Sequence, residues 1–230
     1  MRHFKRTGFC RTMEENGKIK TVLCYGDSNT WGYMPETDGR FPWEVRWPGI
    51  LQRRLGESYR VIENGICGRT TQFDSFREKF VNGYTGAEEC VLMNTPLDMV
   101  IVMLGTNDCK DFYGAEPEEI GQGLENVGKL FSQSGADVCI LSPPPLKGID
   151  RSPFRNEFGN EAEEKSRKLS GIFREVSERN HWEFMDTAFI IETGTFDGIH
   201  MTKEAHRKLG YEAAAWIKKK ETSYEKSTLN

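Results

Sequence analysis

The sequence predicts an α/β domain in which helices cover both faces of a parallel β-sheet. Short, almost continuously apolar runs alternate with longer amphipathic segments along the chain. Strands buried on both faces read as such runs, and parallel strands need a connecting helix between them. At 230 residues the chain suits one domain of this kind, and no repeat, low-complexity tract or linker indicates a second.

The predicted elements alternate regularly along the chain. The strands are Lys20–Tyr25, Tyr59–Asn64, Asp98–Leu104, Asp137–Ser142 and His181–Asp186. The helices are Trp47–Leu55, Thr85–Met93, Pro117–Phe131, Glu157–Glu178 and Thr202–Lys219, the last with Thr202 as a candidate N-cap. We therefore expect one domain over residues 20–222, after a flexible extension of residues 1–19 and before a tail of residues 223–230.

Two segments match no regular element. Residues 30–47, "TWGYMPETDGRFPWEVRW", hold two prolines and five aromatic side chains, and we expect a structured loop there. Residues 142–154, "SPPPLKGIDRSPF", cannot form a helix or an interior strand, because proline removes backbone donors.

The composition argues against several classes of function. A net charge of −4 gives no electrostatic basis for binding nucleic acid or an anionic membrane. Apolar runs such as Met99–Leu104 are too short to span a bilayer, and the opening residues lack the apolar stretch of a secretory signal. The six cysteines show no CxxC pair or metal-ligand spacing, so we expect reduced thiols and a cytoplasmic location.

Polar and glycine residues follow the predicted strands at the points where the strands end. The segments are "GDSNT" after the first strand, "GICGRTT" after the second, "GTND" after the third and "DTAFIIETGTFDGIH" after the fifth. In an open parallel sheet, ligands bind beyond the carboxyl ends of the strands. We therefore expect these segments to converge on one edge of the sheet.

These segments supply the parts of an acyl-transfer site. Ser28 offers a hydroxyl that becomes a nucleophile once a base such as His200 removes its proton. Asp197 precedes His200 by three residues, so a bent loop can bring its carboxylate to the imidazole and fix the tautomer. The backbone N–H groups of Ser28 and Gly68 and the amide of Asn107 are candidate oxyanion donors. Each residue alone also fits a cap, a turn or a structural histidine; their joint occurrence after different strands favours catalysis.

The blocks "GDSNTWG", "GICGRTT", "GTND" and "DGIH" resemble those of the SGNH hydrolases, the GDSL-type esterases and lipases. The sequence is most similar to the bacterial arylesterase/acyltransferase group, through "VIENGICGRTT", "DMVIVMLGTNDCK", "LSPPPL" and "DGIHMT". The resemblance implies a flavodoxin-like three-layer α/β/α sandwich with a parallel five-stranded sheet in the order 2-1-3-4-5. It also implies a catalytic triad of Ser28, Asp197 and His200, an oxyanion hole of Ser28, Gly68 and Asn107, and a homo-oligomer.

One residue departs from the family motif: Asn29 occupies the position of the leucine in Gly-Asp-Ser-Leu. We expect this change to alter the wall of the substrate pocket and to leave the chemistry intact. Asn29, Trp31, Tyr33 and Thr106 are therefore candidate substrate contacts. The aromatic loop of residues 30–47 is either a hydrophobic entrance for small esters or a core or subunit contact.

The resulting prediction is a serine esterase for small-molecule aryl or alkyl esters with short acyl groups, without a metal or another cofactor. Acyl transfer to alcohols is an open extension, and carbohydrate acetylesterase and lysophospholipase activities are alternatives within the superfamily. A flavodoxin-like binding module is a different class, but a glycine-rich phosphate loop is missing from the sequence. A metallohydrolase using Asp27, Asp108, Asp197 and His200 would lack the paired histidines typical of such sites.

Overall fold

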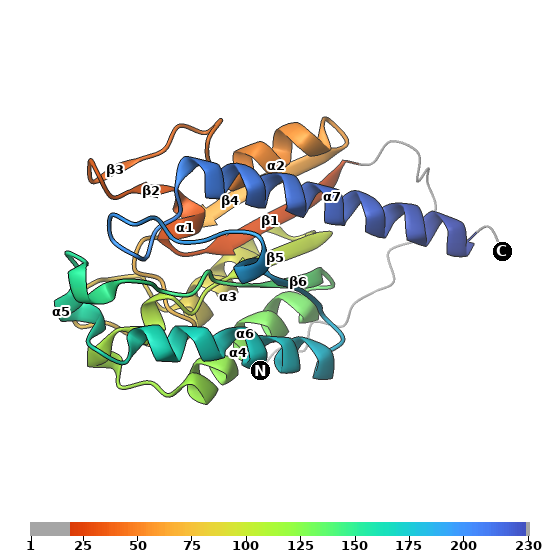
Figure 1. The fold of residues 1–230 in the computed structure, drawn as a ribbon. Helices are drawn as coiled ribbons and strands as arrows, with labels where there is room; N and C mark the ends of the chain where they lie inside the picture. Colours follow the sequence, from red (N-terminus) through yellow and green to blue (C-terminus); the bar gives the residue numbers. More distant parts are fainter. Residues whose placement is uncertain (1–18, 229–230) are drawn as a thin grey trace, which may run out of the picture.

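The computed structural model describes the backbone of residues 19–228 and the side chains of residues 19–222. In this part of the chain, a five-stranded parallel sheet has the strand order β4-β1-β5-β6-β7 (Figure 1). Its strands are β1 (Lys20–Gly26), β4 (Tyr59–Gly65), β5 (Met99–Met103), β6 (Asp137–Ser142) and β7 (Glu183–Asp186). Numbered within this sheet alone, the order is 2-1-3-4-5, so the predicted topology is confirmed.

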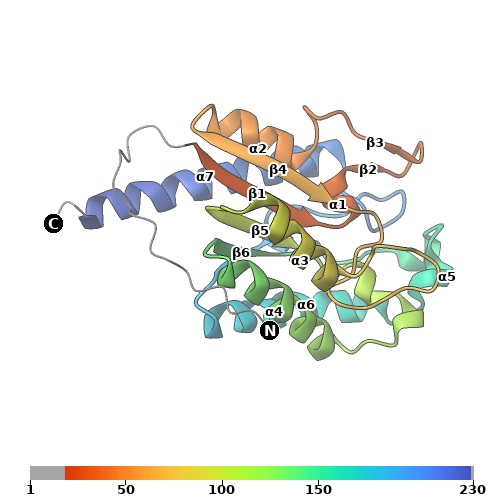
Figure 2. The ribbon, with the colours of Figure 1, turned by 180° about the vertical axis from the view of Figure 1, so that it is seen from behind.

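Helices cover both faces of the sheet, as Figures 1 and 2 show. One face carries α2 (Trp47–Leu55) and α7 (Lys203–Thr228), and the other carries α3 (Gly83–Asn94), α4 (Pro117–Gln133) and α6 (Ala162–Arg179). Val22 and Cys24 of β1 belong to the core under α2 and α7, whereas Leu23 and Tyr25 belong to the opposite core. Successive side chains of a strand point to opposite faces, so β1 must be apolar throughout. The predicted three-layer α/β/α sandwich is confirmed.

The helix predicted over Glu157–Glu178 is two helices in the structure. A short helix, α5 (Arg155–Phe158), ends at Gly159, whose φ of 66° lies in the left-handed region, before α6 begins. At the far end of α6, His181 has a φ of 57°, and the N–H of Trp182 donates to the carbonyl of Ser177 at 2.9 Å. This Schellman ending delays β7, which therefore begins two residues later than predicted.

The last helix is longer than predicted. It continues to Thr228 and so includes the first six residues of the predicted tail of residues 223–230. After Gly210 the helix contains no glycine or proline that would end it. At its start, the hydroxyl of Thr202 accepts the N–H of Ala205 at 3.2 Å, as expected of a cap. The predicted extension of residues 1–19 lies outside the described residues except for Ile19.

The loop predicted over residues 30–47 is partly regular. Its first residues belong to α1 (Ser28–Trp31), and β2 (Tyr33–Met34) pairs antiparallel with β3 (Gly39–Arg40) to form a small hairpin. Figure 1 shows α1, this hairpin and α5 at the same end of the molecule, where the sheet strands have their carboxyl ends. The irregular segments therefore surround the edge at which a ligand is expected.

Candidate active site

The turn between β1 and α1 carries Ser28 at the edge of the sheet. Asp27 caps the helix, because its Oδ1 accepts the N–H of Asn29 at 2.9 Å, and Ser28 is the first helical residue. Gly65, at the end of β4, allows close packing, since a Cβ there would lie 2.2 Å from the backbone nitrogen of Trp31. The local sequence thus fixes the serine hydroxyl on a short helix that is packed tightly against the sheet.

A tight loop before α7 carries Asp197 and His200. Oδ1 of Asp197 accepts the N–H groups of Ile199 at 2.9 Å and His200 at 3.0 Å, and Oδ2 lies 2.6 Å from Nδ1 of His200. Gly198 has a φ of 72°, and a Cβ there would lie 2.0 Å from the carbonyl oxygen of Lys147. Burial acts to raise the pKa of Asp197, but the hydrogen bond and charge of His200 outweigh it and keep that pKa below its ordinary value. The carboxylate is therefore held ionised beside the imidazole.

The two loops meet at the hydroxyl of Ser28. Its Oγ lies 2.9 Å from Nε2 of His200, whose other ring nitrogen faces Asp197. The structure thus brings the three residues of the predicted triad into one hydrogen-bonded row, and all three are buried. The ring of Tyr33 lies against the imidazole, with a centroid distance of 4.4 Å. An imidazole so placed can accept the serine proton while the carboxylate stabilises the resulting charge.

The predicted oxyanion donors lie beside this row. Gly68, with a φ of 80°, and Asn107, the first residue of the 3₁₀ helix η1 (Asn107–Cys109), line the same cavity as Ser28. One N–H of the Asn107 amide donates to the carbonyl of Arg69 at 3.1 Å. That bond fixes the amide plane and leaves the second N–H for another acceptor. Donors from Gly68 and Asn107 at the wall of the cavity that holds the Ser28 hydroxyl can stabilise an oxyanion.

A cavity of about 170 Å³ opens onto Ser28 and His200. Part of its lining is apolar and comes from Tyr33, Phe154, Phe158 and Ile199. Another part is charged: Nζ of Lys110 lies 3.0 Å from a carboxylate oxygen of Glu157 and 3.8 Å from one of Glu78. This charged wall could not be predicted from the sequence, because the spacing of three isolated residues gives no signal that the fold brings them together.

The chain matches the GDSL-like Lipase/Acylhydrolase family over residues 24–208. It belongs to that family. An aryl esterase from M. smegmatis is 34% identical, with a TM-score of 0.83 over 87% of this chain and 99% of that one. Est24, a carbohydrate acetylesterase from Sinorhizobium meliloti, is also 34% identical, with a TM-score of 0.82 over 86% of this chain and 98% of that one. No curated protein matches the sequence.

The family and its solved relatives establish the chain as a carboxylic ester hydrolase of the SGNH type. Among the described residues, no group of three or more His, Cys, Asp or Glu side chains could hold a metal ion. Within the same residues, no helix has the length and apolar character to cross a membrane.

Three predicted substrate contacts of this acylhydrolase do not line its cavity. Asn29 is turned toward the loop of His200 and bonds to backbone groups there. Trp31 lies under the guanidinium of Arg40, 4.9 Å from its ring centroid, and Thr106 is buried behind the site. Residues that follow a nucleophile or precede an oxyanion donor on a helix point in a different direction from it, so these three side chains lie outside the cavity. Only Tyr33 of the four lines the cavity.

A buried arginine of the acylhydrolase supports the oxyanion loop and was also missed from the sequence. The Arg69 guanidinium donates to the carbonyls of Gly26 at 2.8 Å and Asn64 at 2.6 Å, and lies over the ring of Tyr25, 4.1 Å from its centroid. It thereby joins the ends of β1 and β4 to the segment that contains Gly68. Arg69 is only 2% exposed, so its guanidinium is shielded from bulk solvent.

Two carboxylates lie buried behind the site. Burial raises the pKa of both Asp27 and Asp108 to about 6. Oδ1 of Asp108 accepts the backbone N–H of Thr71 at 2.8 Å and its hydroxyl at 2.5 Å, so this aspartate anchors the loop that follows Gly68. Asp27 acts as a helix cap, and neither aspartate joins the Ser28–His200–Asp197 row.

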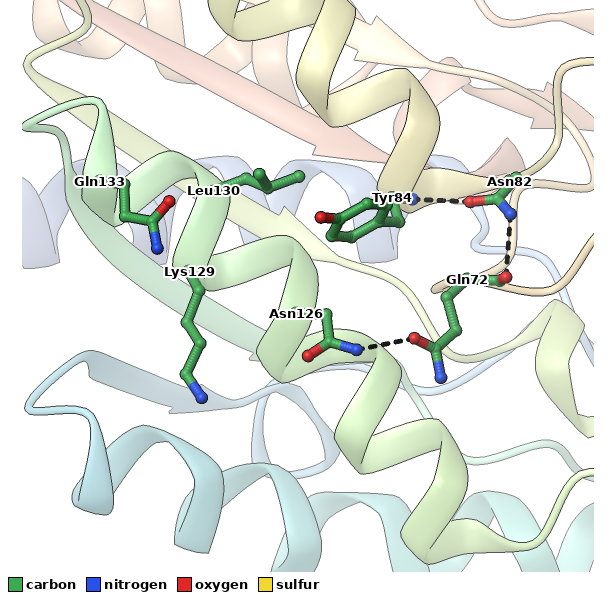
Figure 3. Close-up of a pocket in the computed structure, with 7 residues that line it drawn as sticks. All are labelled: Gln72, Asn82, Tyr84, Asn126, Lys129, Leu130 and Gln133. Atoms are coloured by element: carbon green, nitrogen blue, oxygen red, sulfur yellow. Dashed lines mark hydrogen bonds between the residues drawn. The ribbon is translucent and has the colours of Figure 1, made fainter. Parts of the chain in front are cut away.

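A larger hollow of about 420 Å³ lies between α3 and α4, away from the triad (Figure 3). The side chains lining it are Gln72, Asn82, Tyr84, Asn126, Lys129, Leu130 and Gln133. Several of them bond to each other: the Asn126 amide donates to Gln72 Oε1 at 2.8 Å, and the Asn82 amide donates to the Gln72 carbonyl at 2.9 Å. This lining has no serine, cysteine or histidine, and its Lys129 is ion-paired with Glu125 at 2.9 Å, so its size does not make it a reaction site.

Proposed function

We propose that this hydrolase cleaves small esters with short acyl groups through an acyl-enzyme on Ser28. The observation that carries the proposal is the 2.9 Å contact between Ser28 Oγ and His200 Nε2, at the wall of a cavity of about 170 Å³. A cavity of this size suits a small acyl group or a small alcohol. It argues against the long acyl chain of a lysophospholipid, the alternative that fits the site least well.

In the proposed reaction, His200 Nε2 takes the proton of Ser28 as Oγ attacks the carbonyl carbon of the ester. Asp197 holds the imidazole in the required tautomer and stabilises its positive charge. The carbonyl oxygen becomes an oxyanion, which accepts hydrogen bonds from the backbone N–H groups of Ser28 and Gly68 and from the Asn107 amide. His200 then protonates the departing alcohol. A water molecule, activated by the same imidazole, releases the acid from Ser28.

Carbohydrate acetyl esters are a second candidate substrate class, favoured by the charged part of the cavity. Lys110 is buried, and its ion pairs with Glu157 and Glu78 place both donors and acceptors in the lining. Sugar hydroxyl groups need such donors and acceptors, whereas a plain alkyl group would leave them desolvated without compensation. The similarity to Est24, which is a carbohydrate acetylesterase, agrees with this candidate.

A substrate panel tests both classes. We expect kcat/KM for p-nitrophenyl esters to be highest for acetate to butyrate and to fall steeply for longer chains, because the cavity is small. Undiminished activity on long acyl esters would contradict the proposal.

Acetylated sugars are assayed beside the panel with two variants. Lys110→Met should lower kcat/KM on acetylated sugars roughly 10-fold, since a charged donor is lost, and leave p-nitrophenyl acetate nearly unchanged. Lys129→Met, at an exposed position outside the cavity, is the matched control.

We also propose acyl transfer to alcohols, supported by the apolar part of the lining. An alcohol competes with water for the acyl-enzyme only if the site binds the alcohol or excludes water. Tyr33, Phe154 and Phe158 provide apolar contacts next to Ser28 for such an alcohol.

A homo-oligomer is proposed for the enzyme in solution. Four large apolar side chains of the loop after β4 and of α3 are more than 80% exposed: Phe76, Phe80, Leu92 and Met93. Sedimentation velocity should give a mass above that of one chain, and Leu92→Lys should lower it. A monomeric wild-type protein at micromolar concentration would contradict this proposal.

A cytoplasmic location is proposed on the state of the cysteines. Cys24, Cys67, Cys90, Cys109 and Cys139 are all free thiols in the described part of the chain. Fractionation of the producing cells, followed by immunoblotting, should find the enzyme with cytoplasmic markers. Recovery with secreted proteins would contradict the proposal.

A further inference from the structure

Asn29, the residue that departs from the Gly-Asp-Ser-Leu motif, lies next to the nucleophile but is not in the cavity. We propose that Asn29 is a positioning residue that fixes the imidazole of His200 by bonding to the two peptide units on either side of it. This inference rests on the proposed role of His200 as the general base. It replaces the expectation that Asn29 contacts the substrate.

Both ends of the Asn29 amide are used. Its Nδ2 donates to the carbonyl of Ile199 at 3.2 Å, and its Oδ1 accepts the N–H of Met201 at 2.9 Å. The two partners belong to the residues immediately before and after His200. Asn29 is 2% exposed, and Ile199 and Met201 are also buried, so water cannot replace either bond.

The geometry couples the nucleophile to the base through adjacent residues. Ser28 and Asn29 are consecutive on α1, and they contact the His200 side chain and the backbone on either side of it, respectively. The helix is itself fixed by the Asp27 cap on the N–H of Asn29. Any rotation of the His200 peptide units relative to α1 must therefore break at least one of the two Asn29 bonds.

The other attachments of the histidine loop do not involve α1. The N–H of Gly194 donates to the carbonyl of His200 at 2.7 Å, and the N–H of Lys147 donates to the carbonyl of Gly198 at 3.0 Å. These bonds shape the loop and tie it to the segment after β6. Among the described residues, the hydrogen bonds that join α1 to this loop come from Ser28 and Asn29. Since Ser28 must move its proton during the reaction, Asn29 supplies the bonds that persist.

A leucine at this position would have the same branched shape and number of heavy atoms but could make neither bond. The Ile199 carbonyl and the Met201 N–H would then be buried without partners, and the loop would shift to satisfy them. Displacement of a catalytic group by about 1 Å can cost roughly 100-fold in rate. The effect should fall mainly on kcat, because Asn29 itself lines no part of the cavity that binds the ester.

The test compares Asn29→Leu with Thr30→Val, a control at the next position of α1, whose buried hydroxyl has no hydrogen-bond partner. We expect Asn29→Leu to lower kcat roughly 10- to 100-fold with little change in KM, and Thr30→Val to change neither appreciably. The low-field NMR resonance of the His200 Nδ1 proton should shift or broaden in Asn29→Leu. An unchanged kcat and an unchanged resonance would overturn the proposal, and a raised KM with normal kcat would return Asn29 to substrate binding.

Asn29→Asp provides the test if the leucine variant does not fold. The aspartate keeps the acceptor for the Met201 N–H and loses the donor to the Ile199 carbonyl, so kcat should again fall while the fold is retained. A fully active Asn29→Asp enzyme would overturn the proposal. Ser28→Ala separates this outcome from the failure of the proposed function: if that variant is inactive while the Asn29 variants are fully active, only the positioning role is lost.

Discussion

His200 and His206 lie six positions apart, and both are buried, with exposed fractions of 8% and 0%, yet their surroundings differ in chemistry. His200 faces the Asp197 carboxylate on one side and the Ser28 hydroxyl on the other. His206 instead accepts the backbone N–H of Trp47 at 3.3 Å and packs edge-on against the ring of Phe41. Burial, together with the charges of Arg46 and His200, lowers the pKa of His206 to about 3.

Burial alone makes a neutral structural histidine, as His206 illustrates. His206 keeps an acceptor for the first N–H of α2, a helix end that has no side-chain cap of its own. A general base needs a carboxylate that stabilises the imidazolium and a cavity through which substrate reaches the second nitrogen. His200 has both, because Asp197 faces its Nδ1 and the cavity opens onto its ring.

The largest expected effect separates the two histidines by activity. Ser28→Ala and His200→Ala should each lower kcat roughly 10⁴- to 10⁶-fold, and the double variant should lose little more, since the two groups act as one unit. His206→Asn should keep most of the activity, because its side-chain oxygen can replace Nδ1 as the acceptor. Steady-state assays on p-nitrophenyl acetate with enzyme free of contaminating esterase measure all four. Near-normal turnover of Ser28→Ala would remove the nucleophile from the proposed site.

The next effect concerns Asn107, which is proposed to act with His200 but transfers no proton. The Asn107 amide is expected to stabilise charge that exists only in the transition state, so Asn107→Ala should lower kcat roughly 10²- to 10³-fold. KM should change much less, and the melting temperature should fall by only a few degrees, because the buried bond to the Arg69 carbonyl is lost. A normal kcat in a folded variant would show that the free N–H of Asn107 faces no oxyanion.

The third prediction uses pH to isolate the structural histidine. The pKa of His206 is depressed in the folded protein, so its contribution to stability is complete above about pH 6.5 and is lost as pH falls toward 3. At pH 5 the loss should be roughly 2 kcal/mol. Asp27 and Asp108, whose pKa values are raised to about 6, act in the opposite direction between about pH 6 and 4, because the folded state holds their protons more tightly.

The contribution of His206 to stability can be separated from that of the two aspartates by comparing the wild type with a His206 variant. Urea unfolding of the wild type and of His206→Asn is followed between pH 7.5 and pH 5, and the free energies of unfolding are subtracted at each pH. The aspartate contribution is common to both proteins and cancels, so the wild type should lose stability relative to the variant as pH falls. A difference that does not vary with pH would mean that His206 is not buried as a neutral imidazole.

The site residues that could be predicted from the sequence lie at the ends of strands. Ser28, Gly68, Asn107 and His200 could be found because each follows a strand, and parallel topology brings all strand ends to one edge. The direction of a side chain on a four-residue helix could not be inferred, so Asn29 was assigned to the pocket although it bonds to the histidine loop. The break of a predicted helix at Gly159 was missed for a similar reason, since a single glycine is tolerated in many helices.

The charged wall of the cavity could not be predicted from the sequence either. Lys110, Glu78 and Glu157 come from three separate segments, and only the packed structure brings their charges together. The buried guanidinium of Arg69 likewise depends on carbonyl groups from two different strands. Contacts of this kind have no period along the chain, whereas strands and helices do.

The smallest expected effect concerns the aromatic ring beside each histidine. Phe41 is buried against His206, whereas Tyr33 lies against His200 and lines the cavity. Removal of the Tyr33 ring should admit water to the acyl-enzyme. With a small primary alcohol present, the wild type should form more ester than the mole fraction of the alcohol predicts. Tyr33→Ala should lower the ester-to-acid ratio roughly two- to fivefold.

Two variants serve as controls for this ratio, which gas chromatography of the products measures. Tyr33→Phe keeps the ring and loses only the hydrogen bond to Asp38 at 2.9 Å, so its ratio should match that of the wild type. Trp31→Ala removes a ring that does not line the cavity, and it should also leave the ratio unchanged. If the wild-type ratio merely follows the mole fraction of the alcohol, the enzyme is a plain hydrolase. If Trp31→Ala and Tyr33→Ala shift the ratio equally, the effect belongs to the stability of the hairpin, because a ring outside the cavity cannot exclude water from Ser28 directly.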